Sequence, residues 1–471
     1  MASLFISAAH KSSGKTTVSI GLNAVLRERG LCVQPFKKGP DYIDPIWLSM
    51  AAGRSCYNLD FYTAGKEETI QDYLRRSEGV DISIIEGNKG LYDGLDLDGS
   101  NSNAALASAL KTPVILVVDA RGTMRGIAPL LIGYQVFDRD VNIAGVIANM
   151  TGGARHESKL RAAVEHYTDI PFLGAIGNDD SICLTEKHIG LIPGYEDPES
   201  LSKISAIADT VNQHIDIDRI IDIANTAPKM DTKPTAPVQV STHTGLKIGI
   251  ARDSAFGFYY PGDLEAIQAT GAELVSINTL RDDELPFIDG LFIGGGFPER
   301  HAASLEANTQ LRQSIKTAIE DGLPVYAECG GLMYLSRKLT WQGKSFDMVG
   351  AIPAHSTMHE RPCGRGYVKL EENLQLSPWP RIDDSSTTIY AHEFHYSSLD
   401  DLPENSQFAY RVERGSGINQ EYDGLVYKNL LASYTHLRNT PSTPWVERFL
   451  AFVSQHKAAC QPETWAVVQN S

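Results

Sequence analysis

Short runs of apolar residues recur along the N-terminal half of the chain, and each leads into a helical pattern. They lie at residues 4–8, 82–85, 114–118 and 143–148. Strands that are short and apolar at every position are typical of a parallel sheet covered on both faces. Their alternation with helices predicts an α/β fold.

The pattern breaks near residues 226–245, where proline and small polar residues dominate as in an interdomain linker. Apolar runs resume after it and predict strands at residues 247–251, 291–293 and 325–327. We therefore expect two α/β domains and a tail. The expected divisions are residues 1–225, a linker at 226–245, a second domain at 246–455 and a C-terminal tail at 456–471.

Composition narrows the class of protein. The chain has 471 residues and a net charge of −16, which argues against nucleic acid or an anionic membrane surface as partner. It shows neither a signal-peptide pattern nor an apolar run long enough to span a membrane. The six cysteines are scattered without a CxxC pair, so a reducing, cytoplasmic compartment fits best: Cys32, Cys56, Cys183, Cys329, Cys363 and Cys460.

The first predicted strand runs into a loop of small residues and then a helical pattern, which is the context of a phosphate-binding loop. Backbone N–H groups and the helix N-terminus favour phosphate oxygens there. Ala9 stands where the first glycine of such loops is usual. The expected ATP-binding residues are Ser12, Ser13, Gly14, Lys15, Thr16 and Thr17.

Oxygen ligands for Mg²⁺ are expected close to that loop. The Thr16 hydroxyl is one candidate, and Asp41 and Glu86 are two carboxylates at or near strand ends, where ligands gather in open α/β sheets. Asp119 is a weaker further candidate. Asn149 follows another predicted strand, and its amide could bind an adenine edge.

In the second half, an apolar strand ends at Cys329, two glycines follow, and a helix begins. This turn would present the thiol at a helix N-terminus, where the dipole favours the nucleophilic thiolate. An upstream cluster contains Gly295 and Gly296. Their N–H groups, with that of Gly330, could form an oxyanion hole.

A cysteine nucleophile needs a base. His436 sits at the end of a predicted strand and could take the thiol proton. His392 and His395 compete with it for this role or for shaping the site.

Six segments together resemble the cobyrinate a,c-diamide synthase family. They are residues 38–45, 86–94, 294–299, 329–331, 392–395 and 432–436. The resemblance covers nearly the whole chain. It implies a P-loop synthetase domain, similar to dethiobiotin synthetase, joined to a class I-like glutamine amidotransferase domain.

The resemblance also implies a reaction. Cys329, activated by His436, would release ammonia from glutamine. ATP with Mg²⁺ would activate the a and c acetate groups of a tetrapyrrole as acyl phosphates, which ammonia would convert to amides in two rounds. No acidic third member of the glutaminase triad is evident, so none is assigned.

Departures from the corrinoid pattern bear on the substrate. Lys38 replaces a common apolar residue, and Asn88-Lys89 replaces Val-Met. This variant is similar to the sirohaem amidase branch of the family, and the added lysines favour sirohaem slightly over a corrinoid. They could instead be surface charge. The substrate contacts expected are Lys38, Tyr42, Lys89, Tyr92, Asp93, Arg121 and Arg125.

Two other functions compete. A P-loop ATPase of the partitioning type would explain the first half alone, and a dethiobiotin-synthetase-like ligase would leave the Cys329 turn without a task. A homodimer is the default expectation for an enzyme of this kind.

Overall fold

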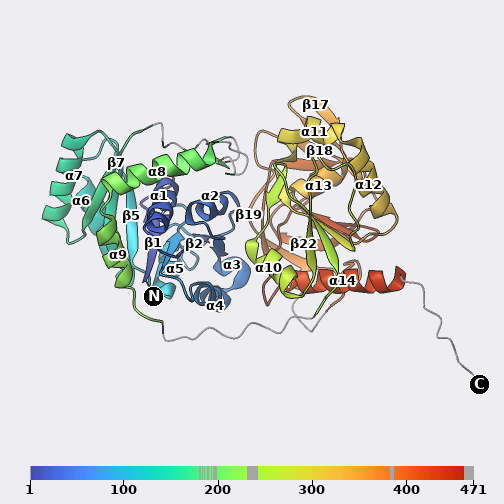
Figure 1. Cartoon of the computed structure of the whole chain (residues 1–471), viewed down its shortest axis with the longest axis horizontal. Helices are drawn as coiled ribbons and strands as arrows, with labels where there is room; N and C mark the ends of the chain where they lie inside the picture. The colour runs from blue at the N-terminus through green and yellow to red at the C-terminus, as the bar shows by residue number, and fades with distance from the viewer. Residues whose placement is uncertain are drawn as a thin grey trace, which may run out of the picture. The chain divides into compact units, whose positions relative to one another are not determined.

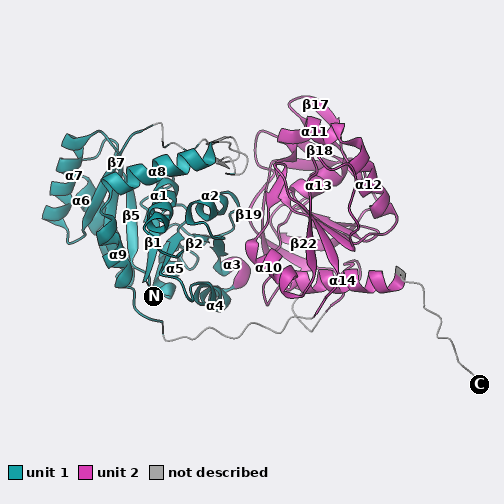
Figure 2. Cartoon of the chain, viewed as in Figure 1, with its two compact units in different colours: residues 1–61, 65–236 teal, residues 62–64, 237–471 magenta. Residues whose placement is uncertain are grey.

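The structure is a computed structural model that describes residues 2–179, 182, 184, 186–187, 190–191, 194, 199–230, 242–381 and 387–460. It contains two compact units (Figure 2). Unit 1 comprises Met1–Phe61 and Gly65–Ala236, and unit 2 comprises Tyr62–Ala64 and Pro237–Ser471. Residues 231–241 of the expected linker and 461–471 of the expected tail lie outside the described residues.

Unit 1 is built on one parallel sheet of seven strands in the order β3-β2-β4-β1-β5-β6-β7 (Figure 1). The four predicted apolar runs are four of these strands, and every residue of β4 is buried. The strands are β1 Ala2–Ala8, β2 Val33–Lys38, β3 Tyr57–Leu59, β4 Ile82–Glu86, β5 Val114–Asp119, β6 Ile143–Thr151 and β7 Phe172–Gly177. A separate pair joins β8 (Glu186–Lys187) to β9 (Gly190–Leu191).

Helices cover both faces of this sheet, as expected for strands that are apolar on both sides. One core contains the buried residues of α1 (Lys15–Glu28), α2 (Ile43–Ala52), α8 (Ser200–His214) and α9 (Ile217–Asn225). The opposite core contains those of α4 (Lys66–Arg76), α5 (Asn103–Leu110), α6 (Ile127–Phe137) and α7 (Ala154–Tyr167). The short helix α3 spans Phe61–Ala64.

Unit 2 holds a mixed nine-stranded sheet in the order β12-β10-β13-β15-β24-β23-β22-β19-β20. Its first five strands pair in parallel and the rest antiparallel. The parallel strands are β12 Glu273–Ile277, β10 Lys247–Ala251, β13 Gly290–Ile293, β15 Val325–Glu328 and β24 Leu430–Ser433. The antiparallel ones are β23 Tyr422–Tyr427, β22 Gln407–Arg414, β19 Gly364–Glu372 and β20 Thr388–His395.

Two smaller sheets complete unit 2. The pair β11 (Phe256–Phe258) and β14 (Gly295–Gly296) is antiparallel. The other sheet joins β17 Lys344–Asp347, β16 Ser336–Trp341, β18 Ile352–Met358 and β21 Ser397–Asp400.

Helices cover both faces of the large sheet in unit 2 as well. One core contains residues of α11 (Ala302–Ala307), α12 (Thr309–Glu320) and α13 (Gly330–Leu335), and the other contains residues of α10 (Pro261–Ala269) and α14 (Trp445–Cys460). A 3-10 turn, η2, spans Pro298–His301. The parallel strands and their helices confirm the α/β class predicted for both halves.

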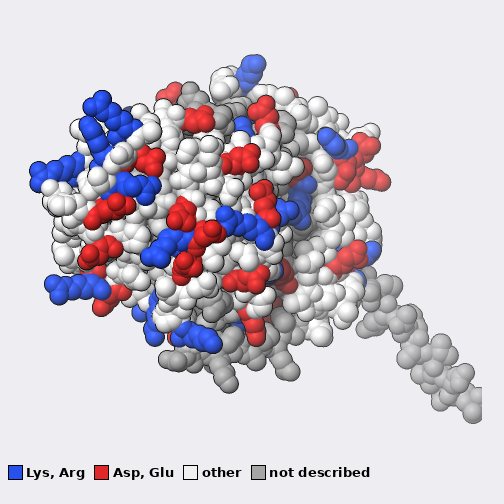
Figure 3. Space-filling model, turned by 60° about the vertical axis from the view of Figure 1, so that its left-hand side comes forward, with Lys and Arg blue, Asp and Glu red and all other residues white. Residues whose placement is uncertain are grey.

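Charges of both signs are interspersed over the face drawn in Figure 3, so the negative net charge is not one continuous acidic field there. Among the described residues, no helix combines the length and the apolar character needed to cross a membrane.

Candidate active sites

The loop after β1 has the backbone geometry of a phosphate-binding turn. Ser12 and Gly14 both have positive φ angles, of 64° and 83°. A Cβ on Gly14 would lie 1.9 Å from the Asn149 amide nitrogen, so only glycine fits. Helix α1 then begins at Lys15 and points its N-terminus at the loop. The Ala9 carbonyl accepts a hydrogen bond from the Tyr134 hydroxyl.

Asn149 supports this loop directly. Its Nδ2 donates to the Ser13 carbonyl over 2.9 Å, from the end of β6. That contact uses one of the two N–H donors of the amide expected to bind an adenine edge. The adenine role stays a prediction.

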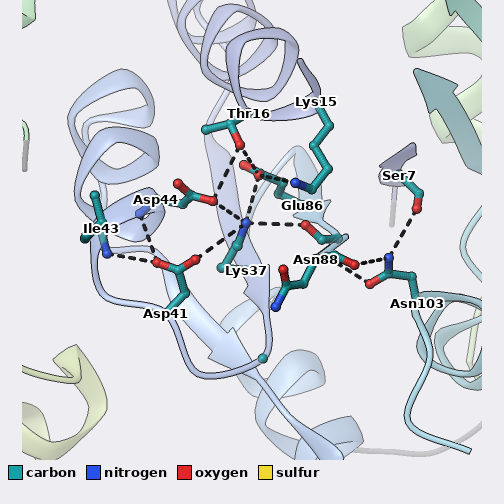
Figure 4. Close-up of polar contacts among 12 residues, drawn as sticks. Ser7, Lys15, Thr16, Lys37, Asp41, Ile43, Asp44, Glu86, Asn88 and Asn103 are labelled. Carbon is teal, nitrogen blue, oxygen red and sulfur yellow. Dashed lines mark hydrogen bonds and ion pairs between the residues drawn. The ribbon is translucent and has the colours of Figure 1, made fainter. Parts of the chain in front are cut away.

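A buried lysine joins the loop to three carboxylates (Figure 4). The Lys37 side chain is 1% exposed, and its Nζ lies 2.8 Å from Glu86 Oε1 and 3.8 Å from Asp41 Oδ2. It also forms an ion pair with Asp44. Burial alone lowers the pKa of Lys37, but Asp44, Glu86 and Asp41 outweigh it and hold that pKa well above its usual value. Lys37 therefore stays charged. Sequence reasoning did not identify it.

The P-loop side chains reach the same cluster. Thr16 Oγ1 donates to Glu86 Oε1 over 2.7 Å and lies 3.5 Å from Asp44 Oδ2. Lys15 Nζ is 3.9 Å from Glu86 Oε1. Burial, and secondly the neighbouring Lys37, lower the pKa of Lys15. Asp41 Oδ1 instead accepts from the backbone N–H groups of Ile43 and Asp44, so it also closes the start of α2.

The oxygen atoms here suit a hard divalent cation. Glu86 Oε2 is buried and has no hydrogen-bond partner among the residues that the structure describes. The other oxygen of the same carboxyl group, Glu86 Oε1, accepts a hydrogen bond from the Thr16 hydroxyl. A hydroxyl and a carboxylate are therefore adjacent, as in a magnesium site whose remaining ligands are phosphate and water. Among the described residues, no three His, Cys, Asp or Glu side chains form a metal-binding group. Asp119 is held by Arg121 through contacts of 2.6–3.1 Å.

The residues expected to bind substrate differ in their surroundings. Lys38 is only 7% exposed, and its Nζ donates to the Asn101 carbonyl over 2.7 Å. Burial is the main cause that lowers the pKa of Lys38, and Lys89 adds to it. Lys38 is therefore not the surface charge allowed as an alternative, whereas Lys89 is exposed.

The remaining substrate candidates have partners within unit 1 or lie at its surface. Tyr92 donates to the Tyr134 carbonyl over 2.6 Å, and Asp93 accepts from Gly90 N over 2.9 Å. Arg125 lies over the Tyr167 ring at 5.1 Å. Arg121 pairs with Asp119, and Tyr42 is half-buried at the start of α2.

In unit 2, β15 ends in a sharp turn at Cys329 before α13 begins. Cys329 has φ 47° and ψ −99°, a conformation rare for a residue with a side chain. Its N–H donates to the Ser433 carbonyl over 2.7 Å, which fixes the turn against β24. A Cβ on Gly331 would lie 2.3 Å from the Ile293 carbonyl, so this tight turn needs glycine. The thiol stands at the N-terminus of α13, as the sequence predicts.

His436 links the thiol to a carboxylate. Its Nδ1 lies 3.2 Å from Glu328 Oε2. Burial lowers the pKa of His436, but hydrogen bonds with Cys329 and Glu328 outweigh it and raise that pKa to about 10. A nucleophile, a base and an orienting carboxylate therefore lie in a row, as in a hydrolase triad.

Glu328 is the acidic member that sequence reasoning left unassigned. Its other oxygen accepts from Leu437 N over 2.9 Å and from the Tyr326 hydroxyl over 2.5 Å, so the carboxyl group is fixed. One signal was available in the sequence: a glutamate closing an otherwise apolar strand is almost never buried without a partner. The same reasoning applies to Lys37 in the buried strand β2.

The two competing histidines occupy supporting positions. His392 stacks on His436 with ring centroids 5.0 Å apart, and its Nδ1 faces the Tyr260 hydroxyl at 3.2 Å. Burial, then the charges of His436 and Arg438, lower the pKa of His392 far below its usual value. His395 stacks on Tyr434 at 3.9 Å and bonds to the Ser397 carbonyl. The structure thus brings His436 to the thiol and places His392 behind it.

The glycine cluster borders this row. A Cβ on Gly295 would lie 2.6 Å from His436 Cε1, and one on Gly330 would lie 3.0 Å from Gly296 N. Pairing of β14 with β11 holds the cluster in place. The backbone of β14 and the first residue of α13 therefore lie close together beside the nucleophile, and the oxyanion hole stays a prediction.

Comparisons with known proteins agree with the two sites. Residues 5–191 match the family model described as the CobQ/CobB/MinD/ParA nucleotide binding domain. Residues 247–442 match the CobB/CobQ-like glutamine amidotransferase domain.

Three relatives that match this chain over most of their length share the same name. The chain is 44% identical to the cobyrinate a,c-diamide synthase of Magnetococcus marinus, over 98% of both chains. It is 41% identical to that of Methanosarcina acetivorans, over 92% of both chains. For the Listeria innocua protein of the same name the identity is 39%, over 93% of this chain and 96% of the relative.

These matches confirm the predicted resemblance, the fold class and the enzyme class. The chain combines a nucleotide-binding domain with a glutamine amidotransferase domain, and it is a glutamine-dependent carbon–nitrogen ligase. It belongs to the cobyrinate a,c-diamide synthase family.

Proposed function

We propose that this protein uses ATP and glutamine to convert peripheral acetate carboxylates of a tetrapyrrole, the a and c groups, into amides. The row of Cys329, His436 and Glu328, in the same chain as a phosphate-binding loop, carries the proposal. The names of the relatives support a tetrapyrrole carboxylate as acceptor. A cytoplasmic setting remains our expectation.

The residues of unit 2 suit glutamine hydrolysis. Because the pKa of His436 is raised to about 10, the proton of the Cys329 thiol resides on His436, and the thiolate attacks the side-chain amide carbon of glutamine. Backbone N–H groups of Gly295, Gly296 and Gly330 would stabilise the oxyanion. His436 returns the proton to the leaving ammonia, and water then releases glutamate from the thioester. Glu328 keeps the imidazole oriented through both steps.

The residues of unit 1 suit activation of a carboxylate. The loop at residues 9–14 and the α1 N-terminus would hold the ATP phosphates, and Lys15 would neutralise the terminal ones. Thr16 and Glu86, with Asp44 or Asp41, would hold Mg²⁺, which would supply charge neutralisation on those phosphates. Attack of the substrate carboxylate on the γ-phosphorus then breaks the bond to the β–γ bridging oxygen, which gives an acyl phosphate and releases ADP. Ammonia displaces phosphate from it to form the amide.

Two tetrapyrroles fit the proposed reaction. The names of the relatives favour a cobyrinate-type corrinoid. Lys38 is buried and its pKa is lowered mainly by burial, so a carboxylate of either substrate would stabilise its ammonium group. The preference for sirohaem rests on the departures of Lys38 and Lys89 from the corrinoid pattern. Lys89 lies near enough to affect Lys38 and could contribute to the same contact.

Mass spectrometry tests the proposal directly. The purified enzyme would be incubated with ATP, Mg²⁺, ¹⁵N-amide glutamine and either sirohaem or a cobyrinate-type corrinoid. We expect ¹⁵N to enter two carboxamide groups of one of them. Amidation of sirohaem that Lys38→Met weakens would support the sirohaem branch. Amidation of the corrinoid alone would assign the cobyrinate activity, and labelling of neither would contradict the proposal.

A further inference from the structure

The segment that carries His436 follows β24 and belongs to no named helix or strand; it spans residues 434–439. Tyr434 and Thr435 are fully buried, so their N–H groups must find partners within the fold. Both donate to Asp423. The Tyr434 N–H donates to Oδ1 over 3.0 Å, and the Thr435 N–H donates to Oδ2 over 3.0 Å. One carboxyl group therefore fixes the backbone of the two residues that precede His436.

Asp423 lies in β23 and is 0% exposed. Its Oδ1 also accepts from the Gly424 N–H over 2.8 Å, and its Oδ2 from the Thr435 hydroxyl over 2.6 Å. Each carboxyl oxygen thus accepts two hydrogen bonds. In the part of the chain that the structure describes, no lysine or arginine pairs with this group, and burial raises the pKa of Asp423. A buried carboxyl without a cation is costly, so its presence calls for a reason.

The two backbone N–H groups explain why residue 423 carries a carboxyl. They approach different oxygens, so the side chain must offer an acceptor at both positions. An asparagine has one oxygen, and its NH₂ group would face an N–H at the other position. A carboxylate accepts at both. The arrangement at residue 423 therefore depends on holding Tyr434 and Thr435 together.

The same segment is tied to the turn of the nucleophile. The Ser433 carbonyl accepts from the Cys329 N–H over 2.7 Å, and the Ser433 hydroxyl donates to the Thr435 carbonyl over 2.7 Å. The segment therefore lies between the Cys329 turn and Asp423, and His436 is the next residue along it. A displacement of about 1 Å at a reacting group can cost about 100-fold in rate.

We propose that Asp423 is a positioning residue for glutamine hydrolysis: it fixes the backbone of Tyr434 and Thr435 and so sets the distance between the His436 imidazole and the Cys329 thiol. Asp423 acts through the backbone and takes no part in proton transfer. The inference rests on the proposed roles of Cys329 and His436.

Asp423→Asn in the full chain tests this role. We expect the kcat of glutamine hydrolysis to fall by about 10- to 100-fold, with the KM for glutamine changed by less than about two-fold, because the imidazole moves and glutamine binding does not. Ammonia-dependent amidation should be unchanged. Alkylation of Cys329 by iodoacetamide at pH 7, followed by peptide mass spectrometry, should slow by about ten-fold, because the reactive thiolate loses the protonated imidazole beside it.

Asp289→Asn is the matched control. The Asp289 side chain is 5% exposed and also accepts from a backbone N–H, that of Lys247, over 2.8 Å. It precedes β13, at the end of the parallel strands opposite to Cys329. Both hydrolysis and alkylation should stay within about two-fold of the wild type in this variant.

Thr435→Val provides a second, milder test, which serves if Asp423→Asn does not fold. It removes the hydroxyl bond to Asp423 and keeps the two backbone bonds. We expect a smaller loss of kcat, about five-fold, with the same unchanged KM.

Wild-type hydrolysis and alkylation in both Asp423→Asn and Thr435→Val would overturn the inference. Equal losses in Asp423→Asn and Asp289→Asn would also overturn it, because they would reflect general destabilisation. Cys329→Ala separates this inference from the proposed function. If Cys329→Ala abolishes hydrolysis and Asp423→Asn retains it, the positioning role alone is wrong; if Cys329→Ala retains hydrolysis, the assigned nucleophile is wrong and the inference falls with it.

Discussion

Both candidate sites are built at the end of a parallel strand, in a tight turn that leads to a helix N-terminus, yet they treat the turn residue in opposite ways. In unit 1 the left-handed position before α1 is Gly14, with φ 83°. In unit 2 the corresponding position before α13 is Cys329, with φ 47°. One turn excludes a side chain, and the other holds one in a conformation that side chains rarely adopt.

The difference follows from what each turn must present. Phosphate is bound by backbone N–H groups, so a side chain at Gly14 would only obstruct. Nucleophilic attack needs the side chain itself, lifted out of the strand, as in the nucleophile elbows of hydrolases. The surroundings of the two turns differ as well. The turn of unit 1 lies close to Lys37 and its carboxylate partners, and the turn of unit 2 lies close to His436, which one carboxylate, Glu328, holds in place.

The largest expected effect separates the two turns. Cys329→Ala should lower glutamine-dependent amidation by at least about 1,000-fold, because no other group can form the thioester. It should leave ammonia-dependent amidation intact. Lys15→Ala should do the reverse, abolishing amidation from either nitrogen source while glutamine hydrolysis continues. Initial rates with each nitrogen source would measure this, and a Cys329→Ala enzyme that still uses glutamine would refute the assigned nucleophile.

A smaller effect is expected when the contact between the His436 imidazole and the Glu328 carboxylate is broken. Glu328→Gln should lower glutamine hydrolysis by about 100-fold, because the imidazole loses its orientation and charge partner. Ammonia-dependent amidation should be unchanged. Glu320→Gln is the matched control, since Glu320 pairs with Lys428 in unit 2.

The same substitution should alter the dependence of stability on pH. The pKa of His436 is raised from 6.5 to about 10, so its protonation stabilises the fold fully below pH 6.5. That contribution is lost as pH rises through 10. Glu328→Gln lowers the folded pKa, so its melting temperature should fall less than that of the wild type across this range. An unchanged slope would show that Glu328 does not hold the proton on His436.

The smallest expected effect is the cost in unfolding free energy of a left-handed backbone conformation at a residue other than glycine. Gly30→Ala measures the left-handed conformation alone, because Gly30 has φ 85° and an added Cβ would meet nothing within 4 Å. We expect it to cost about 1–2 kcal/mol of unfolding free energy. Gly14→Ala should cost more and weaken nucleotide binding, since its Cβ collides with Asn149.

Asn149→Ala provides the second half of that test. It removes the side chain with which a Cβ at residue 14 would collide. It also removes the hydrogen bond from Asn149 to the Ser13 carbonyl, which is worth about 1 kcal/mol. The double variant should therefore lose less than the two single changes combined, as measured by denaturant unfolding. Strict additivity would argue against the close approach of Gly14 and Asn149.

Local sequence signals predicted the elements but not their partners. The apolar runs gave strands β1, β4, β5 and β6, and the positions of Lys15 and Cys329 follow from strand–turn–helix patterns confined to a few residues. The contact of Glu328 with His436 joins residues far apart in the chain, so no local pattern contains it.

In unit 1 the sequence also did not predict which side chains contact one another, because local patterns do not contain those contacts. Asp41 and Asp44 lie on one short segment, and only the start of α2 decides which faces Thr16. Lys37 was not identified because a single lysine within an apolar strand does not show which carboxylates surround it.

The buried lysine of unit 1 also affects the net charge that an incoming nucleotide meets. When ionised, Asp41, Asp44 and Glu86 carry three negative charges against the two positive charges of Lys15 and Lys37. Burial raises the pKa of Asp41 to about 7, so the surplus of one negative charge is complete only above that pH. A bare nucleotide, itself a polyanion, would be repelled by that surplus. A nucleotide that already carries a divalent cation would bring its own neutralisation. Lys37 cancels part of that surplus, so its loss would increase the repulsion that a free nucleotide meets at the site.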